Sequence, residues 1–204
     1  MQKTPIVLGL HGVMGSGKSS IAQFLVKKLP FHTYAFAEPI KEACAKLFHF
    51  SKEQMEDRQL KEQIDPRWGI SPRDAFRLIG HGFRQSVCDD IWIKHMQVKL
   101  SSPYRTHTKK SIVIEDVRYQ NEIDFIESLP NGVVIRVIRP GIADRKHASE
   151  TQQTSVRSGI TIVNDYDVPS LTAKAMFALN DLGYFAPSAF ECALAAVNQR
   201  QKMY

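Results

Sequence analysis

The chain has 204 residues, of which 43% are hydrophobic and 24% charged, and it carries a formal net charge of +6. This composition fits one globular domain with a sizeable core, and no apolar run approaches the roughly twenty residues of a membrane span. The N-terminus lacks the features of a secretory signal peptide, so we expect a cytoplasmic protein. Its three cysteines are far apart and its seven histidines form no zinc motif, which predicts reduced thiols and no transition metal. The positive charge suits an anionic partner, either nucleotide phosphates or a nucleic-acid backbone.

The first predicted elements are a strand, a glycine-rich loop and a helix. The apolar run Ile6–Leu10 is typical of a buried strand, Gly12–Ser19 matches G-x-x-x-x-G-K-[ST] at every fixed position, and apolar residues then recur at helical spacing until Pro30. Backbone N–H groups of such a loop surround an anionic oxygen at a helix N-terminus, where the peptide dipoles favour negative charge. The pattern predicts nucleoside triphosphate binding, with Lys18 reaching the β- and γ-phosphates and the Ser19 hydroxyl ligating Mg²⁺. The predicted phosphate-binding residues are Gly12, Val13, Met14, Gly15, Ser16, Gly17, Lys18, Ser19 and Ser20.

Strands and helices alternate along the rest of the chain. Further strands are predicted at 33–37, 111–115, 132–138 and 160–163. Helices are predicted at about 39–48, over the charged segment 51–67 with an end before Pro66, from 72 onward and near 170–182. This alternation predicts an α/β fold of the P-loop NTPase type, a three-layer sandwich with a mostly parallel five-stranded sheet and helices on both faces. The ligand is expected beyond the carboxyl ends of the strands. The stretch 38–110 is too long for a crossover, so we expect it to carry substrate recognition.

Arginines recur on one side of the helix that is predicted to begin at Pro72. Ser71 is its expected N-cap, and Gly80 lies on the arginine side. The arginines are Arg73, Arg77 and Arg84. Guanidinium groups bind phosphate oxygens bidentately, so this side is predicted to bind a substrate phosphate, with a solvated basic face as the alternative. A separate apolar side is expected to pack inward and consists of Phe76, Ile79 and Phe83.

The third predicted strand closes on the residues Glu115-Asp116-Val117-Arg118. An apolar strand that ends on a carboxylate is the Walker-B arrangement, which predicts that Asp116 holds Mg²⁺ or its water shell. Arg118 is two residues further on and is predicted to grip a phosphate. The alternative is a surface turn with a salt-bridged Asp and Arg.

A basic segment follows the fourth predicted strand. It begins with Arg139-Pro140-Gly141 and continues to Arg145 and Lys146. Gly and Pro provide hinges, and basic side chains could close over transferring phosphates, so the segment is predicted to be a lid that excludes water. A mobile surface loop with scattered charge is the alternative.

Several P-loop classes are separated by their sequence signals. The chain has no G-x-G-x-x-G dinucleotide motif and no N-K-x-D segment of a GTPase, and it is shorter than a motor ATPase. Small size and a long insertion before the third strand favour a kinase that acts on a small phosphate-bearing acceptor. The expected organisation is a single kinase domain with core segments 5–37, 111–138 and 160–182, a substrate-binding insertion at about 38–110, a lid at about 139–155 and a C-terminal extension at about 184–204.

Taken together, these motifs resemble the bacteriophage-type deoxynucleoside monophosphate kinases, in the P-loop nucleoside-monophosphate kinase group. The resemblance spans about residues 5–180, and position 38 departs from it because Asp is expected there. Beside the loop, it rests in chain order on Phe36–Lys41, Ser71–Arg73, Ile79–Gly80, Arg84, Asp90–Trp92, Asp116–Arg118, Asn121–Glu122, His147–Glu150 and Val163–Asn164.

The resemblance implies transfer of the γ-phosphoryl group of ATP to a deoxynucleoside 5′-monophosphate, with Mg²⁺. The implied catalytic residues are Lys18, Arg139, Arg145 and Asp116, with Ser19 and Asp116 as the Mg²⁺ ligands. The implied substrate-binding residues are Glu38, Lys41, Arg73, Arg84, Trp92, Arg118 and Glu150. Among these, Arg84 and Arg118 are assigned to the acceptor phosphate, Glu38 to the sugar or base, and Trp92 to stacking or packing near the base.

Two other functions stay open at this point. One is another small-molecule P-loop kinase, such as a dephospho-coenzyme A kinase. The other is a polynucleotide 5′-kinase, which ranks low because the basic loop 101–110 offers Tyr104 as its one aromatic residue. The expected partners are therefore ATP and a deoxynucleoside monophosphate, without a membrane, and a homodimer is left open. The expected location is the cytoplasm, that of the host if the chain is phage-encoded.

Overall fold

The computed structural model describes residues 5–101, 110–142, 159–185 and 190, and the chain divides into two compact units. Unit 1 contains residues 1–34 and 106–204, and unit 2 contains residues 35–105. The finer division into core, insertion, lid and C-terminal extension stays a prediction. No helix in the described part of the chain is long and apolar enough to cross a membrane.

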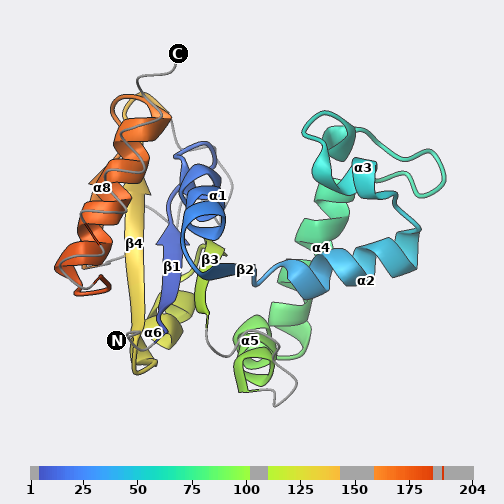
Figure 1. The fold of residues 1–204 in the computed structure, drawn as a ribbon. Coiled ribbons are helices and arrows are strands. Elements are labelled where there is room, and N and C mark those ends of the chain that lie inside the picture. Colours follow the sequence, from blue (N-terminus) through green and yellow to red (C-terminus); the bar gives the residue numbers. More distant parts are fainter. Residues whose placement is uncertain (1–4, 102–109, 143–158, 186–189, 191–204) are drawn as a thin grey trace. The chain divides into compact units, whose positions relative to one another are not determined.

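Unit 1 is built on a parallel sheet with the strand order β2-β3-β1-β4-β5 (Figure 1). Every pairing between these strands is parallel. The strands are β1 (Val7–His11), β2 (Phe31–Tyr34), β3 (Ser111–Val117), β4 (Gly132–Ile138) and β5 (Ile160–Val163). Since all carboxyl ends of parallel strands share one edge, the loops after β1, β3, β4 and β5 gather there.

Helices cover both faces of this sheet, as expected from the alternation of elements. They are α1 (Lys18–Lys28), α6 (Gln120–Ser128) and α8 (Val168–Asp181). Leu8 and Leu10 of β1 belong to the apolar core formed with α1 and α8. Gly9 points to the other face, where a β-carbon would lie 2.8 Å from Ile126 of α6. The three-layer α/β fold is therefore confirmed.

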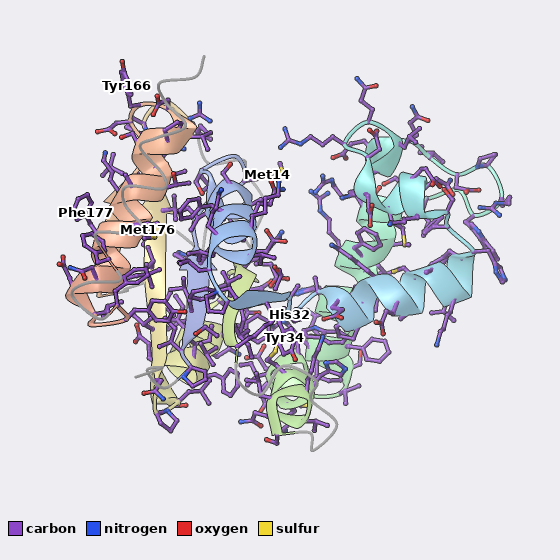
Figure 2. All side chains as sticks on the ribbon, viewed as in Figure 1. Met14, His32, Tyr34, Tyr166, Met176 and Phe177 are labelled. Atoms are coloured by element: carbon purple, nitrogen blue, oxygen red, sulfur yellow. The ribbon has the colours of Figure 1, made fainter. Side chains whose placement is uncertain are left out.

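Helix α8 shows how this core is closed. Met176 is completely buried, whereas its neighbour Phe177 is about half exposed (Figure 2). Leu171, Ala175 and Leu179 repeat at helical spacing and are all buried. Asp167 caps the helix, since its carboxylate accepts a hydrogen bond from the Ser170 N–H at 2.8 Å. The helix thus presents one apolar stripe to the sheet.

Unit 2 is helical. Its elements are α2 (Glu38–Phe48), α3 (Lys52–Glu56), the 3₁₀ turn η1 (Leu60–Glu62), α4 (Pro72–Ser86) and α5 (Ile91–Ser101). The predicted start of α4 is confirmed, because the Ser71 hydroxyl accepts a hydrogen bond from the Asp74 N–H at 3.2 Å. A β-carbon at Gly80 would lie 3.1 Å from Ile40, so this glycine lets α2 pack closely on α4. Gly80 therefore serves the packing of these two helices.

Several predicted boundaries are wrong, each for a local reason. The second strand covers 31–34 and not 33–37, because the chain turns into α2 directly after Tyr34. The charged segment 51–67 is not one helix: the Asp57 carboxylate accepts hydrogen bonds from the Gln59 and Leu60 N–H groups and ends α3. Phe83 is exposed beside the Trp92 ring and does not pack inward. Helices α5 and α6 were not predicted.

Candidate nucleotide-binding site

The loop between β1 and α1 is shaped by glycines that lack room for a side chain. Gly12 has φ 145°, and a β-carbon there would lie 2.3 Å from the Val137 carbonyl oxygen of β4. Gly17 has φ 114°, and its β-carbon would lie 2.6 Å from Leu171 of α8. Both glycines therefore have a positive φ that other residues rarely adopt, and at both positions a side chain would collide with a neighbouring atom.

Lys18 is held at this loop by the loop's own backbone. Its ammonium group donates hydrogen bonds to the Gly12 carbonyl and, at 2.9 Å, to the Val13 carbonyl. The Ser16 N–H closes the turn onto the Val13 carbonyl at 3.2 Å. Ser19 and Ser20 lie in the first turn of α1, and Met14 is exposed on the loop (Figure 2).

Backbone donors are available at the same place. Among the described residues, none accepts a hydrogen bond from the Gly15 or Gly17 N–H. Both groups lie at the N-terminus of α1, where the helix dipole favours an anion. A positive ammonium group beside such donors is a chemical environment suited to phosphate oxygens.

The end of β3 lies beside this loop. His11, at the end of β1, pairs in register with Val117, and the ring nitrogen Nδ1 of the buried histidine is 3.2 Å from the Val117 carbonyl oxygen. Asp116 is the preceding residue and half-buried, within the strand. A carboxylate is thereby carried on the strand next to the one that leads into the loop.

Arg118 follows β3 with an exposed side chain and a fixed backbone. Its N–H donates to the Glu122 carboxylate at 2.7 Å, and the Tyr119 N–H donates to the same oxygen at 3.2 Å. Glu122 is buried and in the first turn of α6. Sequence reasoning did not give Glu122 a role, although a Glu at the third position after the N-cap, here Tyr119, is a helix-start signal.

The predicted lid is described only at its beginning. Arg139 is exposed, and its guanidinium group donates to the Gly15 carbonyl at 3.5 Å, so the structure brings this arginine to the loop. Arg145, Lys146 and Glu150 lie outside the described residues.

Asn164, which follows the edge strand β5, forms a hydrogen bond with the loop. It is buried directly after β5, and its side-chain amide donates to the Ser16 carbonyl at 2.8 Å. Sequence reasoning assigned no site role to Asn164. Its position at the carboxyl end of a strand is the signal that could have found it.

The predicted substrate-binding arginines of unit 2 have acidic partners. Arg73 pairs with Glu62, and Arg77 with Asp74 at 3.5 Å. Arg84 is buried, donates to the Asp89 carbonyl and lies 3.9 Å from the Asp89 carboxylate. These pairs orient the guanidinium groups within the unit.

Other predicted residues of unit 2 are also placed by partners. Glu38 forms an ion pair with Lys99 of α5, a residue that sequence reasoning did not select. Trp92 is buried, and its indole N–H donates to the Gly80 carbonyl at 2.9 Å, so the ring packs between helices. Lys41 is exposed on α2.

Lys61 lies among charged side chains of both signs. Burial lowers the pKa of the Lys61 ammonium group, and the positive charges of Lys41 and Arg73 lower it further. The carboxylates of Glu56 and Glu62 act in the opposite direction, so Lys61 lies in a group of basic and acidic side chains. Sequence reasoning did not select Lys61 either.

One relative and several solved structures are similar to the chain. A protein of Acanthamoeba polyphaga mimivirus, provisionally named a deoxynucleotide monophosphate kinase, is 37% identical over 172 residues, which cover 78% of this chain and 89% of that protein. No protein-family model matches the chain.

The solved structures are more distant in sequence. Shikimate kinase from Aquifex aeolicus has a TM-score of 0.48 at 13% identity, covering 89% of this chain and 100% of its own. A sugar kinase from Janibacter has a TM-score of 0.47 at 16% identity, covering 86% of this chain and 95% of its own. A gluconokinase from Sinorhizobium meliloti has a TM-score of 0.46 at 16% identity, covering 88% of this chain and 94% of its own.

Proposed function

The chain belongs to the deoxynucleotide monophosphate kinase family, and we propose that it transfers the γ-phosphoryl group of ATP to a deoxynucleoside 5′-monophosphate, forming the diphosphate and ADP. The observation that carries this proposal is the 37% identity to a relative so named, over 89% of that relative's length. The loop geometry of unit 1 supports it independently, because the loop offers backbone donors and a lysine to an anion.

The donor phosphates are proposed to bind at the loop 12–20. The N–H groups of Gly15 and Gly17 would bind phosphate oxygens, and Lys18 would neutralise charge on the β- and γ-phosphates. Its present bonds to two loop carbonyls keep the ammonium group in reach of such a ligand. Arg139, close to Gly15, and Arg145 are proposed to act on the transferring group.

The residues at this site fit a magnesium ion carried by the nucleotide. Ser19 and Asp116 are the proposed ligands, and both offer the hard oxygen donors that Mg²⁺ prefers. No group of three or more His, Cys, Asp or Glu side chains in the described part of the chain could form a metal site of its own. Mg²⁺ usually takes few protein ligands and several phosphate oxygens, so this donor set is adequate. When bound, the ion would neutralise charge on the phosphates.

The acceptor is proposed to bind through its phosphate and its nucleoside. Arg118 and Arg84 would contact the phosphate, and Arg73, Lys41 and Glu150 are also proposed to bind the substrate. Glu38 would accept a hydrogen bond from the sugar or base, and Trp92 would pack near the base. The fixed backbone of Arg118 supports its role, because a held backbone reduces the entropy lost when the side chain binds.

Phosphoryl transfer of this kind requires no covalent intermediate with the protein. The transferring group is metaphosphate-like, so catalysis consists of aligning donor and acceptor and neutralising charge on the equatorial oxygens. The acceptor phosphate is already ionised, so no strong general base is needed. Lys18, Arg139 and Arg145 are the proposed sources of positive charge.

Turnover assays test this function directly. Formation of ADP from ATP would be measured with each deoxynucleoside and ribonucleoside monophosphate, with dephospho-coenzyme A, and with an oligonucleotide bearing a 5′-hydroxyl. We expect turnover that requires a deoxynucleoside monophosphate and is lost in Lys18→Ala. Turnover with dephospho-coenzyme A or the oligonucleotide, and none with the monophosphates, would replace the proposal with one of those functions.

A further inference from the structure

We propose that Asn164 is a positioning residue of the donor site, which holds the Ser16–Gly17 peptide so that the Gly17 N–H faces the phosphates. The inference rests on the proposed function in one respect, namely that the loop binds the phosphates of ATP. It names a residue 148 positions away from Ser16 in the sequence as part of the phosphate-binding site.

The hydrogen bond that carries the inference is buried and long-range. The Asn164 amide nitrogen donates to the Ser16 carbonyl at 2.8 Å, across 148 positions of sequence. The backbone N–H of Asn164 donates to the Ile138 carbonyl at 2.7 Å, which fixes the residue at the end of the β4–β5 pair. The Ser16 hydroxyl is buried without a hydrogen-bond partner among the described residues. The Ser16 carbonyl is thus the group that links Ser16 by a hydrogen bond to Asn164, the residue after β5.

Because a peptide group is planar, the hydrogen bond to the Ser16 carbonyl also sets the direction of the Gly17 N–H. In a trans peptide the C=O and the N–H point in opposite directions, and no described peptide is cis. When Asn164 binds the Ser16 oxygen, the Gly17 N–H must point away from Asn164. This N–H has no acceptor among the described residues and lies at the N-terminus of α1, where an anion is favoured.

Glycine makes such a restraint necessary. Gly17 populates both signs of φ readily, so its peptide would otherwise reorient at little cost. A β-carbon at Gly17 would lie 2.8 Å from the Asn164 amide nitrogen and 2.6 Å from Leu171, so the loop, Asn164 and α8 are in close contact. Removal of the amide would leave a buried carbonyl without its donor and a peptide free to turn.

The test separates an effect on the phosphates from an effect on the nucleoside. Calorimetric titrations with ATP and with inorganic tripolyphosphate would be made on the wild type, Asn164→Ala and Asn164→Asp. We expect Asn164→Ala to weaken both ligands by the same factor, about five- to thirtyfold, as for loss of a buried hydrogen bond. The KM for the acceptor should stay within about twofold of wild type, as should the affinity for the acceptor measured alone.

A matched control uses another polar contact in the segment that joins β5 to α8. Lys174 donates to the Val163 carbonyl at 2.9 Å and also pairs with Asp165, but it makes no described contact with the loop. Lys174→Ala should leave tripolyphosphate affinity unchanged. An equal loss in both variants would overturn the proposal, since general loosening of the β5–α8 connection would then explain it.

Three further outcomes are decisive. Unchanged tripolyphosphate affinity in Asn164→Ala would overturn the proposal, as would a loss confined to ATP, which would place Asn164 on the adenosine instead. If Asn164→Ala does not fold, Asn164→Asp decides, because it keeps the shape and removes the donor. Its loss relative to wild type should persist in 0.5 M salt, where repulsion from the added charge is screened, and disappearance of the loss there would overturn the proposal. These readouts do not depend on which acceptor is phosphorylated, so failure of the proposed function would be recognised separately in the turnover assay.

Discussion

The Lys18 ammonium group lies 2.9 Å from the Val13 carbonyl oxygen, so the loop that carries the lysine also orients it. We expect the fold to tolerate loss of this contact, because the Lys18 side chain is only partly buried. The lysine can therefore be removed to test chemistry separately from stability.

Lys18→Ala should nearly abolish phosphoryl transfer while the melting temperature stays close to that of the wild type, because the lysine acts on phosphate charge. The measurement is kcat for ADP formation, with Lys27→Ala on the exposed end of the same helix as the control. A folded Lys18→Ala protein that keeps more than about a tenth of wild-type turnover, a barrier change below about 1.4 kcal/mol, would contradict the role of the loop.

Arg118→Ala should weaken the deoxynucleoside monophosphate more than ATP, because it removes charge-assisted hydrogen bonds of about 1.5–3 kcal/mol to the acceptor phosphate. Arg84→Ala should do the same and also lower the free energy of unfolding, since Arg84 is buried and bound to Asp89. Titrations of both ligands and chemical denaturation separate these effects, with the exposed Arg58→Ala as the control. If ATP alone is weakened, both arginines belong to the donor side.

Arg139→Ala and Arg145→Ala should lower kcat far more than they raise either KM, the pattern of an interaction made mainly in the transition state. A positioned arginine of this type contributes about 10³–10⁵ in rate, and shared work between the two would reduce each single effect. Lys28→Ala is the control for loss of one positive charge. A near-normal kcat in both variants would reduce the segment to a charged surface loop.

Gly17→Ala should lower both the free energy of unfolding and the affinity for ATP, because the added methyl group meets Leu171 and the backbone has φ 114°. Gly82→Ala in α4 is the matched substitution: apart from its chain neighbours and the backbone of its own helix, no described atom lies within 4 Å of its β-carbon position. It should stabilise unit 2 by about 0.5–1 kcal/mol, because alanine loses less backbone entropy in a helix. Chemical denaturation measures the free energy of unfolding of both variants, which should fall in Gly17→Ala and rise in Gly82→Ala. An unchanged free energy of unfolding in Gly17→Ala would contradict the close contact with α8.

Acid should destabilise unit 2 partly through Asp65. The buried carboxylate accepts hydrogen bonds from the Arg67 guanidinium at 2.7 Å and the Gln54 amide at 3.0 Å, and the Arg67 bonds chiefly hold the pKa of Asp65 well below its usual range. A pKa lowered in the folded state contributes stability above the unfolded value of about 3.9, and this contribution is lost as the pH falls below it.

Asp65→Asn should therefore be less stable than wild type at pH 7, and the difference should shrink between about pH 4 and the lower folded pKa. Denaturation at a series of pH values measures this, with the exposed Glu56→Gln as the control. A difference that is constant across this range would assign the loss to packing instead of charge.

Local signals predicted much of the fold correctly. The predicted ranges of β4 and β5 are confirmed, because apolar runs bounded by turn residues leave little choice of boundary. Helix α5 was missed because it opens with three consecutive apolar residues, Ile91-Trp92-Ile93, which do not show helical spacing. Helix α6 was missed because it has only nine residues. The segment 51–67 was misjudged because Asp57 and Asp65 bind backbone N–H groups that a helix would otherwise use.

The sequence by itself determined the loop 12–19 and its context, because the motif is contiguous and its glycines, lysine and serine act through local backbone geometry. Tertiary structure decided which distant side chains serve that loop and which are used elsewhere. Asn164 reaches Ser16, and Lys99 reaches Glu38, only because strands and helices bring them together across 148 and 61 positions of sequence. Spacing cannot reveal such pairs, since the register of a parallel sheet and the packing of two helices depend on contacts made throughout the unit. The same reason explains why the sequence did not reveal that Gly80, on the arginine side of α4, accommodates Ile40.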